Sequence, residues 1–449
     1  FFYKNLEVRG MGVYFNPGNE SFKRARNSQI FVDKTGLIEY LNKRLSTEEN
    51  CIALSHARRF GKSHAAGMID AYYSLGCDST KLFEDTEIAK SSDFKKYMNK
   101  YNVIHLDISS VWDFHKEDLV ESIHERVCED FQKEYADTLN YDKALYLLIR
   151  EIYNKTNIPF VIIIDEWDCI LREKKEDTTS FETYLDYLRT LFKDQPYVAL
   201  AYMTGILPIK KYGTQSALNM FREYSMTNPN MFEEYVGFTE TEVLELCSEY
   251  KMDLEEMMNW YDGYSFETVP HVYNPKSVVE AIIRKQFGSY WTRTETYEAL
   301  KCYIDMNLNG LKDAITCMLG GETIKIDPET FQNDMTTFET KDDVLTLLVH
   351  LGYLAFDKKT SSVFIPNREV RGEFVRAING VNWASVAKAI EDSEKLLKAT
   401  LAMDEKAVEE MLDIAFMKGC SPTIICESAG TQAEDAKAMM DYWKEKEAL

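Results

Sequence analysis

The chain has 449 residues, a formal net charge of -22 at pH 7 and a hydrophobic fraction of 45%. This length exceeds one ordinary hydrophobic core, so we expect two or three folded domains. The negative charge repels phosphate backbones and anionic membranes, which disfavours nonspecific DNA binding and leaves DNA contact only to a local basic patch. The apolar stretches fall short of the ~20 residues that a bilayer span needs, so no membrane partner is expected.

Nine cysteines are scattered along the chain without a CxxC pair. Their odd number and irregular spacing favour a reducing compartment over a disulfide framework, so we expect a cytoplasmic protein. The chain does not begin with Met, and its first ten residues lack the pattern of a secretory signal. We therefore expect the natural start to lie upstream.

Short β-branched runs alternate with helical patterns through the first half of the chain. Strands are expected at residues 51–55, 102–108, 160–165 and 197–204, and helices at 63–75, 116–135, 142–155 and 181–192. Such alternation is typical of a parallel sheet that helices cover on both faces. The pattern predicts an α/β core over residues 1–238.

The second half has a different pattern, because the strands are expected to stop near residue 240. Four short helices are predicted at 239–250, 253–261, 275–287 and 295–308, which we assign to a helical lid subdomain over 239–310. A helix, a β-hairpin and a helix are then predicted at 343–354, 355–367 and 368–378. This order suggests a winged-helix-like module over 311–380, followed by a helical tail over 381–449.

A phosphate-binding loop is indicated where the strand at 51–55 meets the next helix. At such a junction, consecutive backbone N–H groups and the helix dipole face the phosphates. Lys62 would neutralise the β- and γ-phosphates, the Ser63 hydroxyl would bind Mg²⁺, and Gly61 allows close backbone approach. We assign nucleotide binding to Arg58, Arg59, Phe60, Gly61, Lys62, Ser63 and His64.

The loop departs from the strict pattern GxxxxGK[ST], which has Gly where this chain has His56. The positive charge of Arg58 and Arg59 could compensate, and an altered loop conformation is equally compatible with the departure. A basic turn ahead of a surface helix is the alternative interpretation, which the position after a buried strand disfavours.

Two carboxylates, Asp165 and Glu166, end the most apolar predicted strand, at the edge where open α/β sheets bind ligands. Asp165 would hold Mg²⁺ and Glu166 would polarise the attacking water; the alternative is a strand that ends in solvated acids. Asp168 either holds the turn or is a further ligand. Thr204, at the end of the next strand, either senses the γ-phosphate and orients the water or only caps its strand.

Seven motifs run through most of residues 14–380: FVDKTGLIEYL (31–41), ARRFGKS (57–63), IIIDEWD (162–168), MTGI (203–206), YVGFTETEV (235–243), WYDGYSF with VYNP (260–275) and FIPNREV (364–370). Together they resemble one family, the bacterial and archaeal AAA-ATPase-like proteins that often carry a carboxy-terminal PD-(D/E)XK nuclease-like domain. The phosphate-binding loop of that family usually reads RPRRFGKS, so His56 and Ala57 depart from it, and Trp167 replaces a Tyr in the family's IDEYD.

The resemblance implies a P-loop NTPase core of the AAA type, with ATP and Mg²⁺ as cofactors and hydrolysis coupled to rearrangement of residues 240–380. The nuclease does not carry over, because the tail after Asn382 shows no apolar strand that bears its metal-binding pair. Glu445, Lys446 and Glu447 are expected in a charged helix instead.

Three functions stay open at this point. The first is a Mg²⁺-dependent ATPase that acts as a conformational switch, and the second is a nucleotide-gated binding module with little hydrolysis. The third is a DNA-binding regulator, although acidic residues balance the basic ones over 339–380, so protein docking or self-association is favoured. The WYDGYSF aromatics either stack a base or, as we favour, pin the lid onto the core. An arginine finger stays open among Arg222, Arg189 and Arg172.

Overall fold

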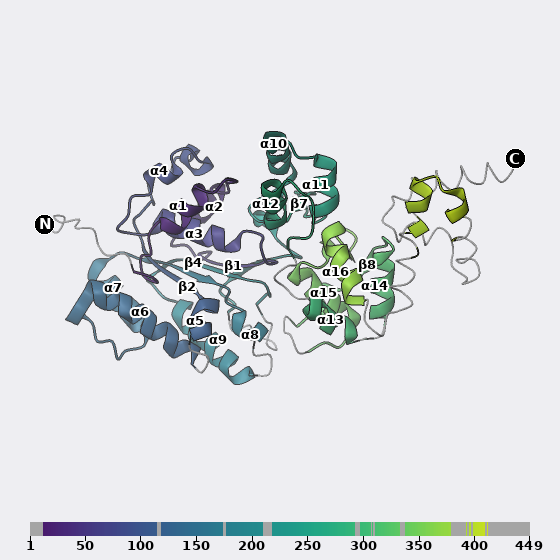
Figure 1. Cartoon of the computed structure of the whole chain (residues 1–449). Helices are drawn as coiled ribbons and strands as arrows, with labels where there is room; N and C mark the ends of the chain where they lie inside the picture. The colour runs from purple at the N-terminus through teal and green to yellow at the C-terminus, as the bar shows by residue number, and fades with distance from the viewer. Residues whose placement is uncertain are drawn as a thin grey trace.

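The computed structural model describes residues 12–114, 118–173, 177–209, 218–291, 297–306, 308, 310–332 and 337–378, with short pieces between 392 and 411. A parallel sheet with its helices forms one body, which we call the sheet body (described residues up to 237). Short helices and two small sheets form the C-terminal body (described residues 238–378), which lies beside it (Figure 1). Most of the predicted tail over 381–449, with Glu445, Lys446 and Glu447, lies outside the described residues.

Five parallel strands make the sheet, in the order β2-β3-β4-β1-β5. The four predicted strands are confirmed, and β4 lies between β1 and β3. The fifth, β5, was not predicted because it is a short edge strand whose first two residues are not buried. The strands are β1 (Cys51–Ser55), β2 (Asn102–Asp107), β3 (Phe160–Asp165), β4 (Val198–Gly205) and β5 (Arg222–Ser225).

Helices cover both faces of this sheet (Figure 1). One face carries α1 (Glu20–Arg26), α2 (Gly36–Asn42), α3 (Lys62–Tyr73) and α4 (Thr80–Phe83). The other carries α5 (Ile108–Phe114), α6 (Leu119–Tyr135), α7 (Leu145–Thr156), α8 (Cys169–Glu173) and α9 (Thr178–Phe192). The four predicted helices of this region are confirmed, with boundaries that differ by up to three residues.

Both faces of β3 are buried, which is why its sequence reads as a continuous apolar run. Because successive side chains point to opposite faces, Val161 and Ile163 join the hydrophobic cluster under α1–α4. Phe160, Ile162 and Ile164 join the cluster on the other face. The strand therefore anchors both layers, and its carboxyl end is held in a fixed place.

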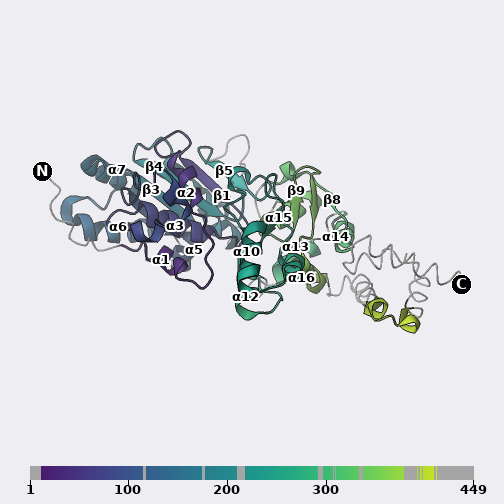
Figure 2. The same ribbon diagram turned by 90° about the horizontal axis from the view of Figure 1, so that it is seen from above.

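The first part of the C-terminal body contains α10 (Glu240–Tyr250), α11 (Leu254–Tyr261) and α12 (Pro275–Arg284). The expectation that strands stop near residue 240 was wrong, since β7 (Val272–Tyr273) pairs with β6 (Phe238–Thr239). A two-residue strand is too short to give a periodic pattern, so the sequence carried no signal for it. In Figure 2, α10 and α12 lie between the sheet body and α14 (Leu311–Leu319).

The remaining elements follow the predicted order of helix, hairpin and helix: α15 (Lys341–Leu351), β9 (Ala355–Asp357), β10 (Ser362–Phe364) and α16 (Arg368–Ile378). β8 (Ile324–Lys325) adds a third strand beside β10, and α13 (Tyr297–Asp305) packs against α16. The identification of this part as a winged-helix module stays a prediction. Within the described residues, no helix is long and apolar enough to cross a bilayer.

Candidate functional site

The predicted phosphate-binding loop occupies residues 56–61, between the end of β1 and the start of α3. Lys62 is the first residue of α3, and Gly61 caps the helix with a φ of 91°. A Cβ at Gly61 would meet no atom within 4 Å, so its left-handed backbone, and not crowding, is what favours glycine. The loop therefore leads directly into the N-terminus of α3, where phosphate groups are favoured.

Lys62 is buried, with 7% of its surface exposed. Its Nζ donates to the carbonyl oxygens of His56 and Ala57, at 2.8 Å each. Burial lowers the pKa of Lys62 to about 8, and the nearby carboxylates of Asp165, Asp168 and Glu166 oppose this shift. The ammonium thus lies within the loop and faces the acidic end of β3.

Asp165 and Thr204 are brought together because β4 lies next to β3. The Thr204 hydroxyl donates to Oδ1 of Asp165, and the backbone N–H of Glu166 donates to the same oxygen at 3.1 Å. Thr204 also stands opposite Leu54 of β1, near the start of the loop. The structure therefore places Thr204 between the loop and Asp165, where its hydroxyl holds the carboxylate.

Glu166 and Asp168 both pair with Arg172 of α8, at 2.8 and 3.2 Å. Glu166 has a φ of 54°, and about a third of its side chain is exposed. Asp168 is fully buried and accepts the backbone N–H groups of Ile206 and Leu207. These bonds favour the structural alternative for Asp168, which is to hold the turn after β4. Arg172 is buried in the same network, which disfavours it as an arginine finger.

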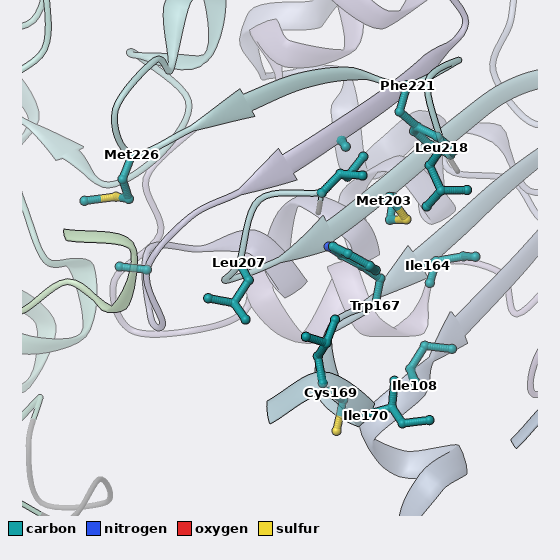
Figure 3. Packing of buried hydrophobic residues seen from close by; sticks show 14 of the residues in the cluster. Ile108, Ile164, Trp167, Cys169, Ile170, Met203, Leu207, Leu218, Phe221 and Met226 are labelled. Atoms are coloured by element: carbon teal, nitrogen blue, oxygen red, sulfur yellow. The ribbon is translucent and has the colours of Figure 1, made fainter. Parts of the chain in front are cut away.

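Trp167 locks the ends of β3 and β4 together. Its backbone N–H donates to the carbonyl oxygen of Thr204 at 3.0 Å, and its ring packs among Ile164, Met203 and Leu207 (Figure 3). A Cβ on Gly205 would come within 2.5 Å of this ring, so only glycine leaves room for it. This packing fixes the separation of Asp165 and Thr204.

A cavity of about 710 Å³ opens beside the loop, a volume within the usual range for small-molecule sites. Arg59, Phe60, Gly61 and the exposed His64 lie along it, and its wall is largely apolar. Segments far apart in the chain supply that wall, which is why sequence reasoning missed it. They include Phe31 and Val32, Ala65 and Met68 of α3, and Pro275 and Val279 of α12.

The motif at residues 31–41 fixes one wall of the cavity. Lys34 donates to the Glu234 carbonyl at 2.6 Å and pairs with Glu242 of α10 at 2.7 Å. Asp33 and Thr35 accept backbone N–H groups of the turn η1 (Glu87–Lys90). The polar residues of this motif thus have structural partners, and they place Phe31 and Val32 at the cavity.

The remaining loop residues have defined places. Phe60 is buried against Tyr264 with ring centroids 5.0 Å apart, and its carbonyl accepts the Gly237 N–H at 3.1 Å. Arg59 reaches the C-terminal body, while Arg58 is half-buried on the loop. His56 is fully buried, and neither of its ring nitrogens has a hydrogen-bond partner. Burial lowers its pKa well below the usual value.

The oxygen donors at this edge suit Mg²⁺. The Ser63 hydroxyl and the Asp165 carboxylate are hard ligands of the kind that Mg²⁺ prefers, with phosphate oxygens completing its coordination. Across the described parts of the chain, no group of three or more His, Cys, Asp or Glu residues could hold a metal ion.

Comparisons with known proteins give a family match over most of the sheet body. Residues 17–214 match the protein family described as "Predicted AAA-ATPase". A search of curated proteins gives no significant match.

Three solved structures resemble the chain distantly. The Walker-type ATPase of Pyrococcus abyssi is 13% identical, over 76% of this chain and 94% of that one, with a TM-score of 0.39. Cdc6p of Pyrobaculum aerophilum is 10% identical, over 80% and 98%, with a TM-score of 0.31. The ORC2 protein of Aeropyrum pernix is 9% identical, over 84% and 99%, with a TM-score of 0.35. Likenesses this distant carry no argument about function.

Proposed function

We propose, from the match of residues 17–214 to the predicted AAA-ATPase family, that the chain binds ATP between β1 and α3 and hydrolyses it with Mg²⁺. One observation supports this most directly. The strand order β3-β4-β1 brings the acids after β3, the Thr204 hydroxyl and the Lys62 loop to the same edge of the sheet. A binding loop, a metal ligand and a candidate base are the parts that phosphoryl transfer needs.

The phosphates would lie over the start of α3. There the backbone N–H groups and the helix dipole favour negative charge, and Lys62 would exchange its bonds to the His56 and Ala57 carbonyls for phosphate oxygens. The adenine base of the nucleotide would occupy the apolar part of the cavity, between Phe31 and Val279.

Ser63 and Asp165 would hold the metal ion, which neutralises charge on the transferred phosphate when bound. Asp165 is oriented for this by the Thr204 hydroxyl and the Glu166 N–H. Glu166 would accept a proton from the attacking water. The ion pair with Arg172, at 2.8 Å, weakens the Glu166 carboxylate as a proton acceptor for as long as the pair persists.

A conformational switch is the role we propose for this hydrolysis. Arg59 and Phe60 of the loop contact Trp291 and Tyr264 of the C-terminal body, so a change in the loop would reach that body. A protein partner or a second copy of the chain is proposed as the target rather than DNA, because the net charge of -22 repels phosphate backbones.

A second candidate is a nucleotide-gated binding module with little hydrolysis. The ion pair of Glu166 with Arg172 favours it, because a base engaged by a buried arginine is not free to activate water. Both candidates require ATP binding, and they differ in turnover.

Phosphate release from Mg²⁺-ATP, measured with ATP binding in parallel, tests the proposal. Replacing Glu166 by Gln removes the proton acceptor, so we expect turnover to fall by about 100-fold or more while ATP binding persists. Glu173→Gln, on α8, is the matched control and should keep turnover. Equal turnover in wild type and E166Q contradicts the role of Glu166, and binding without turnover in wild type favours the gated module.

A further inference from the structure

Arg59 of the phosphate-binding loop forms its hydrogen bonds with the C-terminal body. Its Nη1 donates to the carbonyl oxygen of Trp291 at 2.7 Å and to that of Tyr290 at 3.3 Å. The residue has a φ of 65°, a left-handed conformation that an arginine adopts only when its surroundings hold it. The conformation of the loop therefore depends on where these two carbonyl groups lie.

One carboxylate, that of Glu369, binds the backbone of the same two residues. Oε1 accepts the backbone N–H groups of Tyr290 and Trp291, the latter at 2.7 Å. Glu369 is 2% exposed, and this burial raises the pKa of its carboxyl group. Since the N–H groups of two successive residues turn toward Glu369 and their carbonyl oxygens receive Arg59, the carboxylate holds the segment in the orientation that Arg59 needs.

The second oxygen of Glu369 reaches α12. Oε2 accepts the hydroxyl of Ser277, in the first turn of α12, at 2.7 Å. Pro275 and Val279 of the same helix line the cavity. One carboxylate thus joins the residues that receive Arg59 to the helix that covers the proposed base site.

Glu369 is itself held in place by distant contacts at the start of α16. Asn367 accepts the Val370 N–H at 3.0 Å, and its Nδ2 donates to the Asp262 carbonyl at 2.8 Å. Gly263 packs so closely on Pro366 that a Cβ there would lie 1.9 Å from the Pro366 carbonyl oxygen. The motifs at 260–266 and 364–370 therefore meet in space and fix the position of the carboxylate.

We propose that Glu369, which lies outside the nucleotide site, is a positioning residue for the phosphate-binding loop and acts through the Tyr290–Trp291 segment and Arg59. The proposal deepens the proposed function, because the positioned loop is the one that would bind ATP. The carboxylate accepts two N–H groups and a hydroxyl in a buried place, where charge-assisted bonds are strong and a lost acceptor is costly.

Hydrogen exchange of the nucleotide-free protein tests this without any nucleotide. Glu369→Ala and Arg59→Ala should both speed the exchange of amides over residues 56–66 by at least tenfold, because each removes the attachment of the loop to the C-terminal body through Arg59. Glu369→Gln keeps an acceptor oxygen and a donor for Ser277, so its rate should fall between those of wild type and E369A. Exchange over β3 should not change, which distinguishes a loop effect from loss of the fold.

The matched control is Glu373→Ala, one turn further along α16. Glu373 is also buried, at 3% exposure, and it pairs with Arg376 instead of the 290–291 segment. Its replacement should leave the exchange of the loop within about twofold of wild type. Unchanged exchange in E369A, or equal acceleration in E373A, overturns the proposal.

A double-mutant cycle in ATP affinity then tests the action of Glu369 through Arg59 separately from the proposed function. If Glu369 acts through Arg59, E369A should weaken ATP binding about tenfold in the wild-type background and by less than twofold on top of R59A. Additive losses of affinity would show that Glu369 does not act through Arg59, while the proposal that the protein binds ATP would still stand. A wild-type protein that binds no ATP contradicts the proposed function instead, and the exchange measurement still decides whether Glu369 positions the loop.

Discussion

The sheet body and the C-terminal body are held together in different ways. The sheet body rests on contiguous strands with buried side chains on both faces, and its candidate site residues lie where strands end. In the C-terminal body the strands are only two or three residues long, and single hydrogen bonds join segments about 100 residues apart, such as Tyr264 with Gly352 and Asn367 with Asp262. The difference teaches that the reacting groups follow from local pattern, whereas the groups that hold them in place follow from tertiary contacts.

Among the changes that test this difference, a substitution at Gly263 should have the largest effect on stability. Its φ is 113°, and an added Cβ would overlap the Pro366 carbonyl oxygen. Gly263→Ala should therefore lower the free energy of unfolding by about 3 kcal/mol or more, measured by denaturant unfolding.

Gly372→Ala is the matched control within α16, where an added Cβ meets nothing within 4 Å. It should raise stability by up to about 1 kcal/mol, because alanine has the higher helix propensity. If Gly263→Ala were as harmless as Gly372→Ala, the contact between the two motifs would not support the C-terminal body.

The sequence predicts the strands and helices of the sheet body better than the features that depend on contacts between distant segments. The four longer strands, their helices and the positions of Lys62 and Asp165 followed from apolar runs and strand ends. The strand β5 did not, since its first residues are not buried, and the cavity wall did not, because Phe31 and Val279 are distant in the chain. The role of Glu369 had no sequence signal beyond its place in a motif, since its partners are backbone groups.

A smaller effect on stability is expected at His350 of α15, which is buried near His56 of the phosphate-binding loop. Burial lowers its pKa to about 3, so the native state does not bind the proton that the unfolded chain binds below about pH 6.5. The unfolded state then holds more protons, and stability is lost as the pH falls below 6.5.

His350→Phe should remove this loss. Between pH 6.5 and 5, the variant should lose roughly 1.5 kcal/mol less unfolding free energy than wild type, measured by denaturant titration at each pH. His64→Asn is the control, because His64 is exposed. A variant with the acid dependence of wild type would show that His350 does not cause this loss of stability.

The central claim is that the loop before α3 binds ATP through Lys62. Equilibrium binding of ATP with Mg²⁺ to wild type and to Lys62→Ala tests it most directly, with Lys81→Ala, an exposed lysine of α4, as the control. We predict that wild type and K81A bind ATP alike and that K62A weakens binding by 100-fold or more, about 3 kcal/mol. Equal affinity in K62A, or no binding by wild type, would contradict the account.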